Sequence, residues 1–205
     1  GFAAVTALSV TVSLSVLAHQ VGQAKLALTI FLLAPLFLGF LALNYPFGKV
    51  FLGDGGAYLI GFTLAWLAVD LYASEAAVSP FALLLIFFWP VADTMLAIWR
   101  RTHRGASPAR PDRLHFHQLA IRWLLLKTNM AKRVANPVAT LTLLPPVFIT
   151  QAAGILTWDD FGASLGALIA FAFIFVASYL AGIKSAQRHR TGASTPKIQL
   201  QKAAE

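Results

Sequence analysis

Long uninterrupted apolar stretches limit what this chain can fold into. A bilayer core about 30 Å thick is crossed by roughly 20 mostly apolar residues in a helix. Their continuous apolar character favours helices over the alternating strands of a membrane barrel. The sequence therefore predicts an all-α, polytopic transmembrane helical bundle with about six spans: Phe2–Ala18, Leu26–Leu43, Ala57–Tyr72, Phe81–Trp99, Val138–Leu156 and Phe161–Ile183.

Composition supports this class and narrows the chemistry. With 58% hydrophobic and 12% charged residues, the chain lies outside the usual range of soluble domains. It has no Cys, so a metal ion would need oxygen or imidazole ligands.

We predict a membrane domain over residues 1–183 and a basic, disordered tail over 184–205. The prolines predict kinks or breaks at Pro35, Pro90 and Pro145-Pro146. Because the chain starts at Gly1 without an initiator Met, we expect it to be a piece of a longer protein.

Positive charge collects on one side of the predicted spans. The segment from Arg100 to Arg133 holds nine Lys and Arg residues against one acidic residue, and the tail is also basic. Cytoplasmic loops of bacterial membrane proteins are rich in Lys and Arg. We therefore predict a multi-pass protein of the bacterial inner membrane, with both ends and the loops 44–56 and 100–136 on the cytoplasmic face. Charge alone also allows a loop that only sets topology and attracts anionic lipid.

The first polar motif joins two predicted spans and reads Lys49-Val50-Phe51-Leu52-Gly53-Asp54-Gly55-Gly56. Glycines let the backbone approach a phosphate closely, and the N-terminus of the following helix offers free N–H groups to an anion. Asp54 is a hard oxygen ligand of the kind that Mg²⁺ uses together with substrate phosphates. The alternative is an ordinary Asp-Gly turn between two helices.

The second motif places a carboxylate inside a predicted span, in Pro90-Val91-Ala92-Asp93. Asp93 lies seven residues before Arg100, about 10 Å along a helix, so it falls within the membrane near the cytoplasmic edge. A carboxylate there is expensive and by default faces a polar cavity or a partner. The alternative is a structural pair with Arg100 or Arg101.

The third motif lies in the basic loop and carries an Arg, an Asp and two histidines: Ser107, Pro108, Asp112, Arg113, His115 and His117. Guanidinium binds phosphate oxygens in a fork, and imidazole can donate or exchange a proton, so the group suits a diphosphate or a sugar. Two histidines alone make a weak zinc site. A solvated loop with incidental histidines is the other alternative.

In this order the three motifs resemble those of the polyprenyl-phosphate N-acetylhexosamine 1-phosphate transferases. The resemblance runs from about Asn44 to Leu119. The family pattern N…KVFxGDxGS is similar to Asn44 with Lys49–Gly56. Its P-x-x-D followed by R-R is similar to Pro90, Asp93, Arg100 and Arg101, and its SP…DRxHxHH loop is similar to Ser107–His117.

The resemblance implies an Mg²⁺-dependent glycosyl-1-phosphate transferase, with Mn²⁺ as a substitute ion, acting on UDP-N-acetylhexosamine and polyprenyl (undecaprenyl) phosphate. UMP would be released at the first step of a cell-envelope glycan such as cell wall, lipopolysaccharide or O-antigen. It implies Asp54 as metal ligand and catalytic residue together with His115 and His117. Membrane lipid is a partner, a homodimer is left open, and no nucleic acid is expected. The implied substrate-binding residues are Asn44, Lys49, Asp93, Arg100, Arg101, Asp112 and Arg113.

Some features depart from the family pattern. Ala57 stands where many members have Ser, and Gln118 replaces the last His of the loop. The paired aspartates and the N-x-x-D-G-x-N-G-L segment of the family are not in this sequence, so we expect this piece alone to be inactive. A different class remains as the alternative, namely a membrane transporter or scaffold with a lipid-binding basic loop. A transporter is expected to show paired repeats, and no convincing repeat is present.

Overall fold

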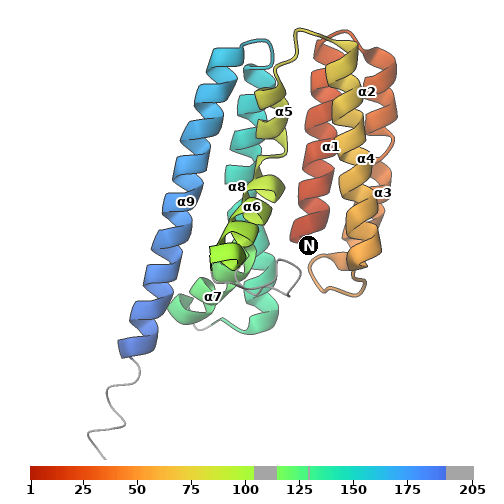
Figure 1. Cartoon of the computed structure of the whole chain (residues 1–205). Helices are drawn as coiled ribbons and strands as arrows, with labels where there is room; N and C mark the ends of the chain where they lie inside the picture. The colour runs from red at the N-terminus through yellow and green to blue at the C-terminus, as the bar shows by residue number, and fades with distance from the viewer. Residues whose placement is uncertain (104–114, 129, 193–205) are drawn as a thin grey trace, which may run out of the picture.

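The chain folds into a bundle of helices with two clearly defined ends. The computed structural model describes residues 1–103, 115–128 and 130–192, with side chains described to residue 185 in the last stretch. Within these residues every regular element is a helix, which confirms the all-α prediction (Figure 1). The helices are α1 Phe2–Gln20, α2 Ala24–Phe31, α3 Ala34–Asn44, α4 Gly53–Ser74, α5 Pro80–Ile86, α6 Phe88–His103, α7 Phe116–Thr128, α8 Lys132–Leu156 and α9 Phe161–Gly192.

The number of membrane spans agrees with the prediction, but one span has a different shape. Among the described residues, five segments are long and apolar enough to cross a bilayer, and the pair α5 and α6 makes a sixth if both form one span. The predicted single helix Phe81–Trp99 is bent by 84° between α5 and α6. Pro90 lies in the first turn of α6, where a missing N–H is tolerated, so the bend precedes the proline.

Of the other predicted proline breaks, the structure has one at Pro35 and none at Pro145-Pro146. Pro35 lies at the start of α3, directly after the break that separates α3 from α2. Pro145 and Pro146 lie inside α8, which continues without a break from Lys132 to Leu156. The helix α9 continues to Gly192, so the segment predicted as a disordered tail begins with helix.

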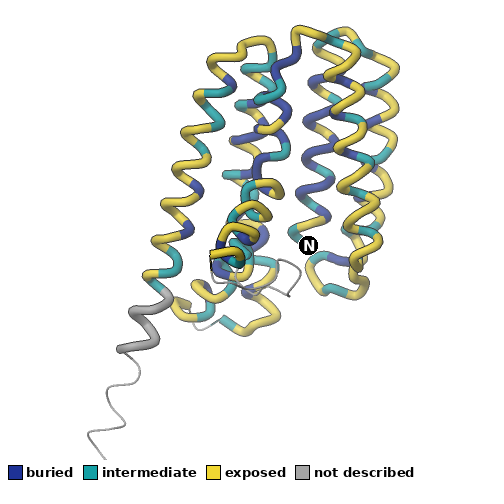
Figure 2. The backbone as a smooth tube through the Cα atoms, viewed as in Figure 1, coloured by how far each residue is buried: buried dark blue, intermediate teal, exposed yellow. Residues whose placement is uncertain are grey.

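The helix α1 forms the centre of the bundle. Of the most apolar 18-residue stretch of α1, 61% is buried. The corresponding share in α9, which lies on the outside of the bundle, is 11% (Figure 2). The buried residues of α1 are mainly Ala, Ser, Thr, Val and Leu. Lipid tails are as apolar as the helices, so helix association in a membrane depends on close packing of small residues and on hydrogen bonds between helices. Gln151 on α8 supplies such bonds, because it accepts one from Ser13 at 3.2 Å and donates one to Ser9 at 2.9 Å.

The segments predicted to share a function lie at the same end of the bundle. The turn between α3 and α4, the end of α6, the helix α7 and the start of α8 all lie at the lower end in Figure 1. The short connections after α1, α4 and α8 lie at the opposite end. The helix α7 is an addition to the prediction, since it occupies part of the segment 100–136 that was expected to be a loop.

Candidate active site at one end of the bundle

The turn between α3 and α4 is held in a fixed shape by its own hydrogen bonds. Asn44 is buried, and its side-chain amide donates to the carbonyl of Val50 at 2.6 Å. Gly48 and Gly53 have φ values of +63° and +66°, a region that glycine adopts without steric cost. This conformation ends one helix and starts the next, and it explains why the turn needs glycines.

Asp54 lies in the first turn of α4 and is exposed. A carboxylate in the first turn is favoured by the helix dipole. No group of three or more His, Cys, Asp or Glu side chains that could hold a metal ion occurs among the described residues. The role of Asp54 as one oxygen ligand of an Mg²⁺ ion stays a prediction, and such an ion would also need ligands from substrate phosphates or water.

The bend before α6 brings the second motif against the third. Asp93 Oδ2 lies 2.9 Å from His115 Nδ1, and Asp93 Oδ1 accepts a hydrogen bond from the backbone N–H of Phe116 at 2.9 Å. The Asp93 side chain is 18% exposed and that of His115 is 36% exposed. One carboxylate thus orients the imidazole and binds the backbone at the start of α7.

His117 is held by different elements. Its Nε2 lies 3.0 Å from Oδ1 of Asn136 on α8, and its ring stacks on Phe2 of α1 with the centroids 5.2 Å apart. Its Nδ1 is buried and has no hydrogen-bond partner in the part of the chain that the structure describes. Burial lowers the pKa of His117 below its usual value, although the hydrogen bond to Asn136 acts in the opposite direction. Burial therefore favours the neutral form of His117.

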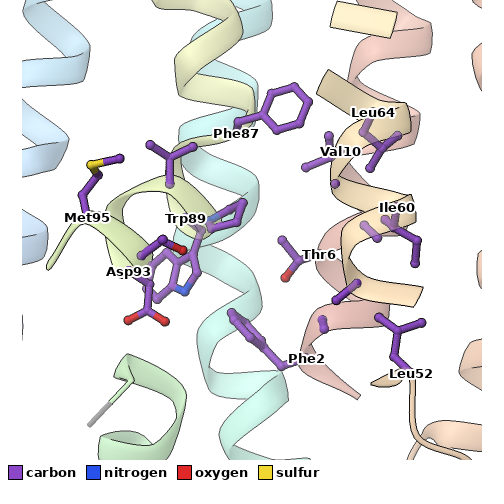
Figure 3. A pocket seen from close by; sticks show the side chains of 17 residues that line it. Phe2, Thr6, Val10, Leu52, Ile60, Leu64, Phe87, Trp89, Asp93 and Met95 are labelled. Carbon is purple, nitrogen blue, oxygen red and sulfur yellow. The ribbon is translucent and has the colours of Figure 1, made fainter. Parts of the chain in front are cut away.

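An apolar cavity of about 510 Å³ opens beside these residues. It lies between α6 on one side and α1 and α4 on the other: Trp89 lies toward Phe2 and Thr6, and the carboxylate of Asp93 points away from them (Figure 3). Among the described residues that line it, Asp93 is the one that carries a charge. The cavity therefore offers an apolar body with one carboxylate in its wall, and that carboxylate binds His115.

A second cavity, of about 460 Å³, lies between the α3–α4 turn and the start of α8. Its lining is more polar and includes Asn44, Lys132, Arg133 and Asn136. Phe51, with 82% of its surface exposed, also lines it. This cavity combines cations, amides and an aromatic ring.

His117 connects the two cavities. Phe2, which stacks on its ring, lines the apolar cavity, and Asn136, which binds its Nε2, lines the polar one. His117 therefore lies between a residue of the apolar cavity and a residue of the polar one.

The remaining predicted site residues do not line either of these two cavities or lie outside the described residues. Arg100 is buried, and its guanidinium donates to the hydroxyl of Tyr179 and lies 5.6 Å from that ring, which ties α6 to α9. Arg101 is half-buried and Lys49 is exposed. Asp112 and Arg113 lie outside the described residues. Substrate contacts of all these residues stay predictions.

Three residues of the site were not predicted from the sequence: Asn136, Phe2 and Trp89. Asn136 lies near the start of a span, and a polar residue at that depth is a signal that could have been used. Phe2 and Trp89 are aromatic residues in apolar stretches, and nothing in their sequence context distinguishes them from core residues.

Comparisons with known proteins agree with the motifs. Residues 1–72 match the model of glycosyl transferase family 4. Undecaprenyl-phosphate alpha-N-acetylglucosaminyl 1-phosphate transferase of Haemophilus influenzae is 40% identical over 116 residues, which are 54% of this chain and 33% of that protein. The proteins of the same name from Pasteurella multocida and Escherichia coli (strain K12) are 38% and 36% identical over 54% and 49% of this chain, and over 33% and 29% of their own lengths.

The chain thus spans about a third of the length of the curated relatives it matches. No solved structure matches it. The family model and the relatives confirm the resemblance predicted from the three motifs: about half of this chain is similar to undecaprenyl-phosphate alpha-N-acetylglucosaminyl 1-phosphate transferases, and residues 1–72 are similar to glycosyl transferase family 4.

Proposed function

We propose that the protein transfers N-acetylhexosamine 1-phosphate from a UDP-sugar to polyprenyl phosphate. An oxygen of the polyprenyl phosphate attacks the β-phosphorus of the UDP-sugar, the bond between the β-phosphorus and the bridging oxygen breaks, and UMP leaves. The product is a polyprenyl-diphospho-sugar. The observation that carries this proposal is the pairing of His115 with Asp93, a residue that lines an apolar cavity, because the pairing joins two separate family motifs at one place.

The apolar cavity suits the polyprenyl chain. Its lining is almost entirely hydrocarbon and aromatic, as a prenyl lipid requires, and it lies between helices that cross the membrane. Asp93 lines it and binds His115, so the imidazole is one contact away from a lipid held in this cavity. The name of the relatives, which specifies undecaprenyl phosphate, supports this ligand.

The polar cavity suits the nucleotide. Lys132 and Arg133 can neutralise phosphate charge, with the Arg fork matching two phosphate oxygens. The exposed ring of Phe51 offers a face on which a base can stack, an interaction worth about 1–3 kcal/mol for single-stranded nucleic acids. Asn44 stabilises the turn that carries Phe51 through its bond to Val50.

The chain's own residues mainly position the substrates and neutralise their charge, as phosphoryl transfer requires. Asp93 orients His115, Asn136 and Phe2 hold His117, and the α3–α4 turn presents Asp54. When bound, Mg²⁺ on Asp54 supplies neutralisation of the diphosphate charge. We place this site on the cytoplasmic face of the bacterial inner membrane, because the basic segments lie at the same end of the bundle.

The test uses the full-length gene product, including any sequence that flanks this chain, in washed bacterial membranes. Polyprenyl phosphate and UDP-N-acetylglucosamine or UDP-N-acetylgalactosamine labelled in the sugar are supplied with Mg²⁺. We expect label in the organic phase together with equimolar UMP, and neither product when EDTA is added. Free sugar phosphate without lipid product, or lipid binding without UMP release, would contradict the proposal and favour hydrolysis or a scaffold.

A further inference from the structure

The two histidines of the third motif are held through opposite ring nitrogens. His115 uses Nδ1, which faces the carboxylate of Asp93. His117 uses Nε2, which faces the side-chain oxygen of Asn136. The nitrogen that remains for a substrate is therefore Nε2 in His115 and Nδ1 in His117.

The partner of His117 fixes where its proton lies. An amide oxygen can only accept a hydrogen bond, so Nε2 must donate and must carry the proton. A neutral imidazole has one proton, and Nδ1 is then a bare acceptor. This nitrogen is buried and has no partner among residues 1–103, 115–128 and 130–185. A buried acceptor without a partner is unfavourable by about 1–3 kcal/mol, which is unusual outside functional sites.

Charged groups act on His117 from two other helices. Asp93 on α6 favours the imidazolium. Lys132 and Arg133 on α8, which line the same cavity as Asn136, are cations. Burial of the ring is the largest influence and lowers its pKa.

We propose that Asn136 is a positioning residue that holds His117 as the Nε2–H tautomer, so that Nδ1 accepts a hydrogen bond from a hydroxyl or amide N–H of the N-acetylhexosamine. The bare nitrogen has no proton to offer to a phosphate oxygen, so its ligand must be a donor group. Asn136 lines the polar cavity proposed for the nucleotide, and His117 lies next to it through its bond to Asn136. The identity of this ligand rests on the function proposed above, whereas the tautomer does not.

The first measurement reads the tautomer directly. The full-length protein is labelled with ¹⁵N-histidine in lipid nanodiscs, and the His117 signals are assigned by their loss in His117→Gln. At pH 7.5 we expect a protonated Nε2 and an unprotonated Nδ1. UDP-N-acetylglucosamine should shift the Nδ1 signal, whereas UMP and polyprenyl phosphate, which lack the sugar, should not.

The second measurement uses variants of Asn136 in the transfer assay. Asn136→Ala removes the acceptor and should lower kcat/KM for the UDP-sugar about tenfold, as expected for one hydrogen bond. Asn136→Asp keeps an acceptor but adds a negative charge, which raises the pKa of His117. Its activity should therefore be low at neutral pH and recover as the pH rises. Thr142→Val is the control, because Thr142 is exposed on the same helix and bonds only to the backbone of that helix.

Each result decides between a positioning role and a structural one. A protonated Nδ1 in the unmodified protein overturns the proposal whether or not transfer is observed. So does an Asn136→Asp variant that is equally impaired at every pH, since a misfolded site does not recover with deprotonation. If UMP shifts the Nδ1 signal as much as UDP-N-acetylglucosamine does, the group that donates a hydrogen bond to Nδ1 belongs to the protein or the nucleotide and not to the sugar. If the expected tautomer is found but no sugar is transferred, the proposed function fails and the role of Asn136 in fixing the proton stands.

Discussion

Asp93 shows how one side chain can serve two elements at once. Each of its carboxylate oxygens has a separate partner, the imidazole of His115 and the backbone N–H of Phe116. The first bond orients a predicted catalytic group, and the second satisfies a donor at the start of α7, where helix N–H groups otherwise lack partners. The intramembrane carboxylate therefore has a polar partner, as the cost of burying it requires.

Replacing Asp93 tests this double role. Asp93→Asn keeps the size of the side chain but removes the charge, and an amide oxygen can satisfy only one of the two donors. We expect transfer to fall by about ten- to a hundredfold, the effect of losing a hydrogen bond to a charged group. Asp70→Asn, an exposed carboxylate on α4, is the matched control and should retain activity. Near-normal transfer by Asp93→Asn would make the pair a packing contact only.

Asp54 is the proposed metal ligand, and replacing it with Asn removes the negative charge of the side chain while keeping its size. Asp54→Asn should abolish transfer and leave membrane insertion intact, because it removes the charge that attracts Mg²⁺ with little change in volume. The measurement is UMP release over a titration of Mg²⁺, with protein amounts matched between variants. A variant that keeps near-normal activity at limiting Mg²⁺ would show that Asp54 only caps the turn.

The basic loop provides a comparison between substrate binding and topology. Ala at Arg113, His115 or His117 should each lower transfer about ten- to a hundredfold, whereas Ala at Arg122 should have a small effect. Arg122 is exposed on α7 and lines neither of the two large cavities at this end, so it reports on charge alone. Similar small losses at all four positions would reduce the loop to a topology signal.

At the scale of elements, the packing of α5 on α8 depends on a single glycine. A Cβ on Gly154 would lie 2.5 Å from the backbone carbonyl oxygen of Ala82 and 3.1 Å from Cβ of Leu85. The backbone oxygen cannot move without shifting α5. Since α5 leads into the bend before α6, this contact also supports the position of Asp93.

Adding a methyl group at Gly154 should therefore destabilise the fold. We expect Gly154→Ala to lower the unfolding temperature of the detergent-solubilised protein, because overpacking is unfavourable by about 1–3 kcal/mol and outweighs a helix-propensity gain of about 1 kcal/mol. Gly166→Ala on α9 is the control, since nothing lies within 4 Å of the added atom. It should leave the unfolding temperature unchanged or raise it. Equal shifts in the two variants would mean that α5 and α8 are not tightly packed.

At the scale of the whole molecule, both cavities and the three motifs depend on one alternation of the helices across the membrane. The helix α4 takes the chain away from the side of the membrane on which the α3–α4 turn lies. The turn and α7 can therefore share a site only if α5 and α6 together cross back to that side (Figure 1). Length and composition leave this alternation open, because five helices are long and apolar enough to cross a membrane and a sixth span forms only if the bent pair α5 and α6 crosses as one.

Reporter fusions test this alternation. A periplasmic reporter fused after Ala76 should be active and a cytoplasmic one inactive, and fusion after Arg110 should give the reverse. The expectation follows from the excess of Lys and Arg between Arg100 and Arg133. Fusion after Asp159, in the turn between α8 and α9, should agree with Ala76. If Ala76 and Arg110 report the same side, the bent pair does not cross and the shared site is wrong.

Sequence alone determined the helical class, the approximate spans and the family, because these depend on local properties. A continuous apolar run of about 20 residues has few alternatives in a bilayer, where backbone groups must be satisfied within the segment. The motifs around Asp54, Asp93 and His115 could likewise be recognised from residue type and order, since each requires a particular chemistry at a particular spacing.

Only the tertiary structure decided how those residues meet. The 84° bend between α5 and α6 cannot be located from Pro90, because it depends on how Phe88 and Trp89 pack against α8 and α9. The same packing turns Asp93 toward His115 rather than toward Arg100, which instead bonds to Tyr179 far along the chain. Asn136 and Phe2 join the site for the same reason: their contacts with His117 link three helices, and no local pattern records which distant residues a helix will touch.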